Sequence, residues 1–81
     1  MEISFNLWPS DYDLLLERLP EESRLYVLLK NGVILKDSCG HRMVQVLCSA
    51  EHAKMLSSLA QKICPDAVSS IEEGIKARTP P

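Results

Sequence analysis

The sequence predicts a small α+β domain, a two-layer sandwich in which an antiparallel β-meander with an extra N-terminal strand is backed by helices on one face. Apolar and polar residues alternate over residues 3–7, which is typical of a half-buried strand. The dipeptide Asn31-Gly32 joins two apolar runs, and this arrangement is the strongest short-range signal for a β-hairpin. Apolar residues at helical spacing occur before and after these runs. We therefore expect the element order β-α-β-β-β-α-α.

The N-terminal segment predicts a strand followed by a helix. Ile3, Phe5 and Leu7 alternate with polar residues and are expected to point inward. This strand should join one edge of the sheet. Ser10 is a suitable N-cap for the helix that follows, and Pro20 should end it. The apolar stripe of this helix is formed by Tyr12, Leu15, Leu16 and Leu19.

The central segment predicts a three-stranded meander over residues 24–47. Strands at residues 24–30 and 33–37 would be joined by Asn31-Gly32, and both turn residues should have positive φ. A third strand over residues 42–47 follows a loop at residues 38–41. Placing Asp37 opposite Arg42 would form a favourable cross-strand charge pair. This register also places Leu35 opposite Val44.

The C-terminal segment predicts two abutting helices. Ser49 is expected to cap the first of them, whose apolar stripe contains Ala53, Leu56, Ala60 and Ile63. Pro65 interrupts the pattern and is suited to the first position of a second helix, although one kinked helix is the alternative. We expect residues 1–77 to form a single domain and residues 78–81 to form a flexible tail, because the apolar period is lost there.

The predicted register makes both faces of the meander apolar at their centres. An antiparallel sheet usually has one solvated face, so the helices should cover only one. We expect them to cover the face with fewer charges, which contains Leu25, Val27, Leu29, Ile34, Met43 and Leu47. The opposite face would then be an apolar patch with a charged rim, which is typical of a protein interface. Cover by the C-terminal helices of the same chain is the alternative. The candidate interface residues are Tyr26, Leu28, Val33, Leu35, Val44 and Val46.

Composition narrows the classes of partner. The 81-residue chain has a formal net charge of −2, which argues against nucleic acid as a partner. No apolar run approaches the ~20 residues of a membrane-spanning helix. The chain has three cysteines, an odd number, and no recognisable signal peptide, so we expect reduced thiols and a cytoplasmic location. We expect the chain to form a homodimer, and a different protein as partner is the alternative.

The cysteines and histidines suggest two kinds of site, a zinc site and a reactive thiol. Cys39, His41, Cys48 and His52 resemble a zinc ligand set, but a strand over residues 42–47 would separate the two pairs by roughly 20 Å. We therefore expect no metal site and no cofactor. Cys48 precedes a helix N-terminus, where a thiol can become reactive, and His52 could act as its base. Cys39, in an exposed loop, is the second candidate for a reactive thiol.

Together these observations predict a non-enzymatic interaction or regulatory module that self-associates through its sheet face. The alternative is a small-ligand-binding or thiol-dependent enzyme domain around Cys48 and His52. A deep pocket holding both side chains would favour the enzyme, whereas an exposed apolar sheet face would favour the module.

Overall fold

The computed structural model describes residues 2–78 and confirms the predicted α+β class, with one three-stranded antiparallel sheet and several helices. Among these residues, no helix combines the length and the apolar character needed to cross a membrane. The elements in chain order are β1 (Glu2–Leu7), α1 (Pro9–Arg18), α2 (Arg24–Lys30), β2 (Val33–Lys36), β3 (Arg42–Ser49), α3 (Ala50–Ile63), the 3-10 turn η1 (Pro65–Ala67) and α4 (Val68–Arg78).

The sheet has the strand order β1-β3-β2, so β1 lies at one edge as predicted. β1 and β3 pair from Glu2 opposite Ser49 to Leu7 opposite Val44. Because directly opposed residues point to the same side of a sheet, the alternate residues of both strands form one apolar face. The prediction that the apolar residues of β1 point inward is confirmed. The buried residues of this face are Ile3, Phe5, Leu7, Val44, Val46 and Cys48.

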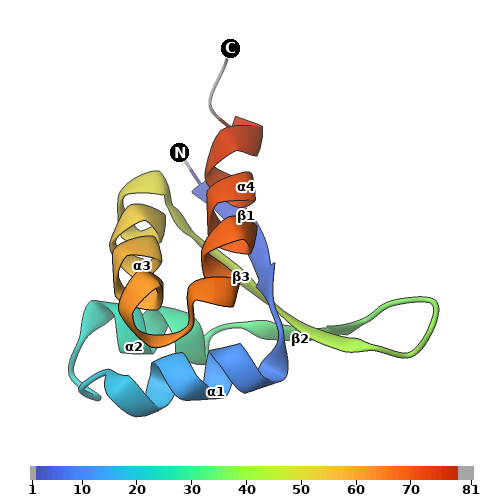
Figure 1. The fold of residues 1–81 in the computed structure, drawn as a ribbon, viewed down its shortest axis with the longest axis horizontal. Coiled ribbons are helices and arrows are strands. Elements are labelled where there is room, and N and C mark those ends of the chain that lie inside the picture. Colours follow the sequence, from blue (N-terminus) through green and yellow to red (C-terminus); the bar gives the residue numbers. More distant parts are fainter. Residues whose placement is uncertain (1, 79–81) are drawn as a thin grey trace.

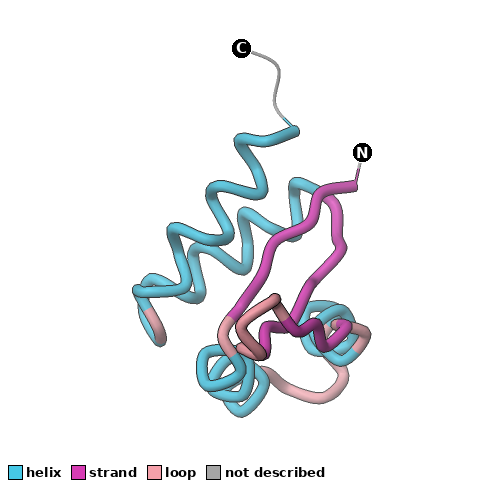
Figure 2. Tube along the Cα trace, turned by 90° about the vertical axis from the view of Figure 1, so that its right-hand side faces the viewer, coloured by secondary structure: helices cyan, strands magenta, loops and turns pink. Residues whose placement is uncertain are grey.

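The helices cover that apolar face in two groups. α3 and α4 form an antiparallel pair along β1 and β3, on one side of the strands (Figures 1 and 2). α1 and α2 pack near the other end of β3 (Figure 1). The core between helices and sheet includes Leu15 from α1, Leu29 from α2, Leu56 from α3 and Ile71 from α4, each fully buried.

Residues 24–30, predicted to be a strand, form helix α2 instead. The Ser23 side chain accepts a hydrogen bond from the Leu25 amide and so caps this helix. Leu25 and Leu29 lie four residues apart and are both buried, which is the spacing of one helical face. The Tyr12 hydroxyl donates a 2.6 Å hydrogen bond to the carbonyl of Leu29. Capping and one-sided burial therefore outweigh the β-propensity of this apolar run.

Asn31 and Gly32 end α2 rather than forming a hairpin turn. Asn31 has φ −86° and ψ 4°, and among the described residues only Gly40 has a positive φ. The prediction of positive φ at both turn residues is wrong. Gly32 is needed for space instead, because a Cβ there would lie 2.7 Å from a Val44 methyl and 3.0 Å from the Leu29 carbonyl oxygen.

The hairpin of this protein joins β2 to β3 through residues 37–41. Lys36 lies opposite Arg42, and Ile34 lies opposite Val44. The predicted register, with Asp37 opposite Arg42 and Leu35 opposite Val44, is therefore wrong by one residue. A slip of one residue exchanges the two faces of a strand. On β3, Val44 and Val46 are therefore buried instead of exposed, and Leu47, which was expected to be covered, is exposed.

The helix boundaries agree with the sequence in most places. Ser49 caps α3 by accepting a hydrogen bond from the His52 amide, and Pro65 begins a separate turn before α4, so two abutting helices are confirmed. α1 begins at Pro9 with Trp8 as its N-cap, not at the predicted Ser10, since proline is favoured in the first helical turn. α4 includes residue 78, and the rest of the predicted tail, residues 79–81, lies outside the described residues.

We expect Gly74→Ala to lower the free energy of unfolding, because α4 packs directly on the backbone of β1. A Cβ at this position would lie 2.5 Å from the Ser4 carbonyl oxygen and 2.9 Å from the Phe5 Cβ. Alanine gains about 1 kcal/mol of helix propensity over glycine, but overpacking typically costs about 1–3 kcal/mol. Because the contact with the Ser4 carbonyl oxygen is so close, we expect a cost near the upper end of this range and a net loss of about 2 kcal/mol, measured by urea unfolding. Ser69→Ala, at an exposed position of the same helix, is the control, and equal stability of Gly74→Ala and wild type would contradict this packing.

Candidate functional site at the β2–β3 hairpin

The structure separates the six residues that were predicted to form one interface. Val44 and Val46 are buried in the core, because the register turns them toward the helices. Tyr26 and Leu28 lie on α2 and are half-buried. Val33 and Leu35 lie on β2 and are exposed. Of the predicted patch, only these two residues are exposed on the sheet.

β2 is an edge strand whose apolar side chains are exposed on both of its faces. The exposed fractions are 51% for Val33, 69% for Ile34 and 38% for Leu35. Ile34 lies opposite Val44 and so points to the helical side of the sheet, whereas its two neighbours point to the other side. Ile34 was not among the interface residues predicted from the sequence, because it was expected on the face covered by helices. Ile34 does point to the helical side of the sheet, but it stays exposed because the β2–β3 hairpin extends away from the helices (Figure 1).

The β2–β3 hairpin extends away from the helices, and its tip lies at the far end of the molecule (Figure 1). The strand β2 pairs only with β3, so its outer edge has no neighbouring strand among the described residues. Exposed apolar residues on an unpaired edge are a site where a further strand can be added. The base of the hairpin therefore presents an interaction surface, here called the β2 edge, formed by Val33, Ile34 and Leu35.

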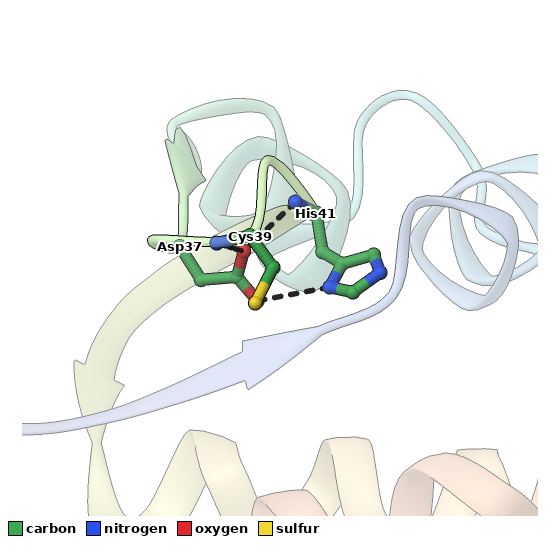
Figure 3. A network of polar contacts seen from close by, with 3 residues as sticks. All are labelled: Asp37, Cys39 and His41. Carbon is green, nitrogen blue, oxygen red and sulfur yellow. Dashed lines mark hydrogen bonds and ion pairs between the residues drawn. The ribbon is translucent and has the colours of Figure 1, made fainter.

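The tip of the hairpin brings three polar side chains together, here called the tip cluster: Asp37, Cys39 and His41 (Figure 3). One Asp37 oxygen accepts hydrogen bonds from the amides of Cys39, at 2.9 Å, and His41, at 2.8 Å. The other oxygen lies 3.2 Å from the Nδ1 of His41. The Asp37 amide donates to the His41 carbonyl at 3.0 Å, and Gly40 takes a φ of +88° that closes the loop.

These hydrogen bonds also affect the titration of Asp37. Hydrogen bonds from the backbone of His41, then from its side chain and from the amide of Cys39, stabilise the carboxylate and lower the pKa of Asp37. Partial desolvation opposes this effect but is smaller than the leading hydrogen bond. The carboxylate is therefore ionised near neutral pH, while Asp37 and His41 both stay exposed to solvent.

The structure does not support a reactive thiol at Cys48. This side chain is 4% exposed, and its burial, followed by the nearby charge of Glu2, raises the pKa of the thiol. A raised pKa disfavours the thiolate, which is the nucleophilic form. The polar contact of the His52 ring is a 3.0 Å approach of Nδ1 to the Ser49 hydroxyl. His52 thus interacts with the helix cap.

A hollow of about 390 Å³ lies between β1 and α4. Its walls include Trp8, Met43, Glu73 and Gly74, and they include neither Cys48 nor His52. The four residues considered as zinc ligands cannot meet at one ion. β3 separates Cys39 and His41 from Cys48 and His52, a span of roughly 20 Å.

Comparisons of the chain with protein-family models, with curated proteins and with solved structures gave no significant match. The β2 edge and the tip cluster are therefore the two features from which a function can be inferred.

We expect Cys39 to be the first thiol to react with an alkylating reagent. It is exposed, whereas Cys48 and Cys64 are buried, and burial raises the pKa of both buried thiols. Iodoacetamide labelling of the native protein near neutral pH, followed by mass spectrometry of peptides, should show complete modification of Cys39 before the others react. Labelling in denaturant is the control, since all three thiols should then react. Modification of Cys48 ahead of Cys39 would instead support the alternative function, a thiol-dependent enzyme.

We expect the Asp37 carboxyl group to titrate below its ordinary pKa of about 3.9. Because this pKa is lower in the folded state, the ionised carboxylate stabilises the hairpin tip at pH values above the pKa of the unfolded chain. This stabilisation is lost as the pH falls through the pKa of the folded state. Carboxyl-carbon NMR shifts against pH would measure the midpoint. His41→Ala removes the imidazole but keeps the amide that contributes most, so its midpoint should also lie below the ordinary value. A midpoint at or above that value in wild type would contradict the hydrogen-bonded loop.

Proposed function

We propose that this protein is a non-enzymatic interaction module that self-associates through the β2 edge. The observation that supports this function is the exposure of three consecutive apolar side chains on a strand with one unpaired edge. Addition of a strand to such an edge combines backbone hydrogen bonds with side-chain contacts on both faces. Most small assemblies are two-fold dimers, so the partner we propose is a second copy of the chain.

A two-fold axis centred on Ile34 suits the residues of this strand. Antiparallel pairing about that axis places Ile34 opposite its own copy and Val33 opposite Leu35 of the second copy. Lys36 then lies opposite Gly32 of the second copy, so no like charges meet. An axis centred on Leu35 would instead place Lys36 opposite Ile34. The first arrangement pairs apolar residues with one another and would join two sheets of three strands into one continuous sheet.

The size of the β2 edge predicts weak association. Four residues per copy bury only several hundred Å², whereas stable complexes bury about 1,200–2,000 Å². Lys36 also stands at the end of the strand, and edge lysines limit open-ended sheet pairing. We therefore propose a concentration-dependent dimer in a regulatory role. A cytoplasmic location belongs to the same proposal, which the three free cysteines support.

We expect Ile34→Lys to abolish self-association at concentrations where wild type forms dimers. The substitution places two like charges at the centre of the pairing, and we expect a loss of at least tenfold in affinity, about 1.4 kcal/mol. Sedimentation equilibrium up to about millimolar concentration would measure this loss of affinity. That range detects a dimer with a free energy of association as small as about 4 kcal/mol.

Met55→Lys is the matched control, because Met55 is also exposed, at 52%, but lies on α3. It should leave the association of wild type unchanged. A wild type that stays monomeric over the whole concentration range would contradict the proposal. Equal loss in both variants would also contradict it, because the effect would then come from overall charge.

A further inference from the structure

We propose that the tip cluster binds one divalent transition-metal ion of the zinc type through Asp37, Cys39 and His41. This site differs from the four-residue set that β3 divides, because Asp37 supplies the third ligand from the same loop. It is also independent of self-association through the β2 edge, since its three ligands come from a single chain.

The donor atoms of the tip cluster are already close enough for one ion. A carboxylate oxygen, the thiol sulfur and an imidazole nitrogen all lie within 4.8 Å of one another. Zinc binds such atoms at about 2.0–2.3 Å, so ligands of a tetrahedral site lie about 3.3–3.8 Å apart. The Asp37 oxygen and the His41 Nδ1, 3.2 Å apart, are already near that separation. A small rotation of exposed side chains would bring Cys39 to the same distance.

The loop holds its three ligands on alternate residues before any ion is present. The Asp37 carboxylate is held by the amides of the other two ligand residues, and Gly40 closes the turn with a conformation that other residues rarely adopt. Figure 3 shows the Cys39 sulfur and the His41 ring beside the same carboxylate. This arrangement lowers the ordering cost of binding, because the backbone of the loop is already constrained.

The chemistry of the donors selects the class of metal. Calcium and magnesium prefer sites built from oxygen alone, whereas sulfur and imidazole nitrogen favour zinc and its neighbours in the transition series. Binding forms a bond from the metal to the Cys39 sulfur and releases the thiol proton to solvent. Three protein ligands leave a fourth position for water, which the exposed position of the tip permits.

Titration of the purified, reduced 81-residue chain with Co²⁺ tests this site. A thiolate bound to cobalt produces a charge-transfer absorption in the near ultraviolet, and Zn²⁺ should displace the cobalt and remove it. We expect this absorption to saturate at one cobalt per chain. Mg²⁺ in excess should leave it unchanged, because the donor set contains sulfur and nitrogen.

Three variants identify the ligands, and one serves as a control. Cys39→Ser should abolish the absorption. Asp37→Asn and His41→Gln should each weaken cobalt binding by at least about tenfold, because even the loss of a residue that only supports a ligand typically weakens metal affinity by that factor. Asp37→Asn keeps an oxygen that can accept the loop amides, so it tests the charge of the ligand separately from the loop. Cys48→Ala removes a buried thiol and should bind cobalt as wild type does.

The site would be ruled out if wild type gave no thiolate-to-cobalt absorption at millimolar cobalt. Persistence of the absorption in Cys39→Ser would also overturn it, because a buried thiol would then be the ligand. Unchanged affinity in Asp37→Asn or His41→Gln would overturn the three-ligand site. Amide NMR spectra of the variants, compared over β1, α3 and α4, check that the fold is retained.

Discussion

The antiparallel pairing of β1 with β3 joins the N-terminus to the middle of the chain, and the arrangement of the other elements depends on it. Its six residue pairs run from Glu2–Ser49 to Leu7–Val44. The pairing turns the alternate residues of both strands toward α3 and α4, which creates the core. It also makes β3 the central strand, so that β2 can occupy only the opposite edge. The exposure of the β2 edge is therefore a consequence of the pairing that stabilises the rest of the sheet.

The β2–β3 hairpin carries two surfaces of different chemical character, and both lie away from the core. The β2 edge is apolar and has unpaired backbone groups, so it suits contact with another strand. The tip cluster is polar and is ordered by hydrogen bonds to one carboxylate, so it suits a small cation. Neither surface is needed to close the core, because all four residues of β2 are exposed. Substitutions there can therefore report on binding while the fold is retained.

Several elements could be predicted from the sequence because their signals are local. Alternation over Ile3–Leu7 predicted a strand with one buried face, since the side-chain period of a strand is two. Ser49 and Pro65 predicted the beginnings of two helical segments, since capping and the missing proline amide act within one turn. Of the candidate site, the exposed thiol of Cys39 and two of the edge residues, Val33 and Leu35, were also predicted.

The sequence by itself determined the α+β class, the inward face of β1, the cap of α3 and the new helical segment at Pro65. The tertiary structure alone decided the state of residues 24–30 and the register of β3. An apolar run such as Leu25–Leu29 is compatible with a helix or a strand, and burial of one side against α1 and β3 selects the helix. The register is set by long-range pairing with β1, and one residue of difference exchanged the buried and exposed faces. Local patterns cannot specify which residues meet across such distances, so the burial of Val44 and Val46 required the fold.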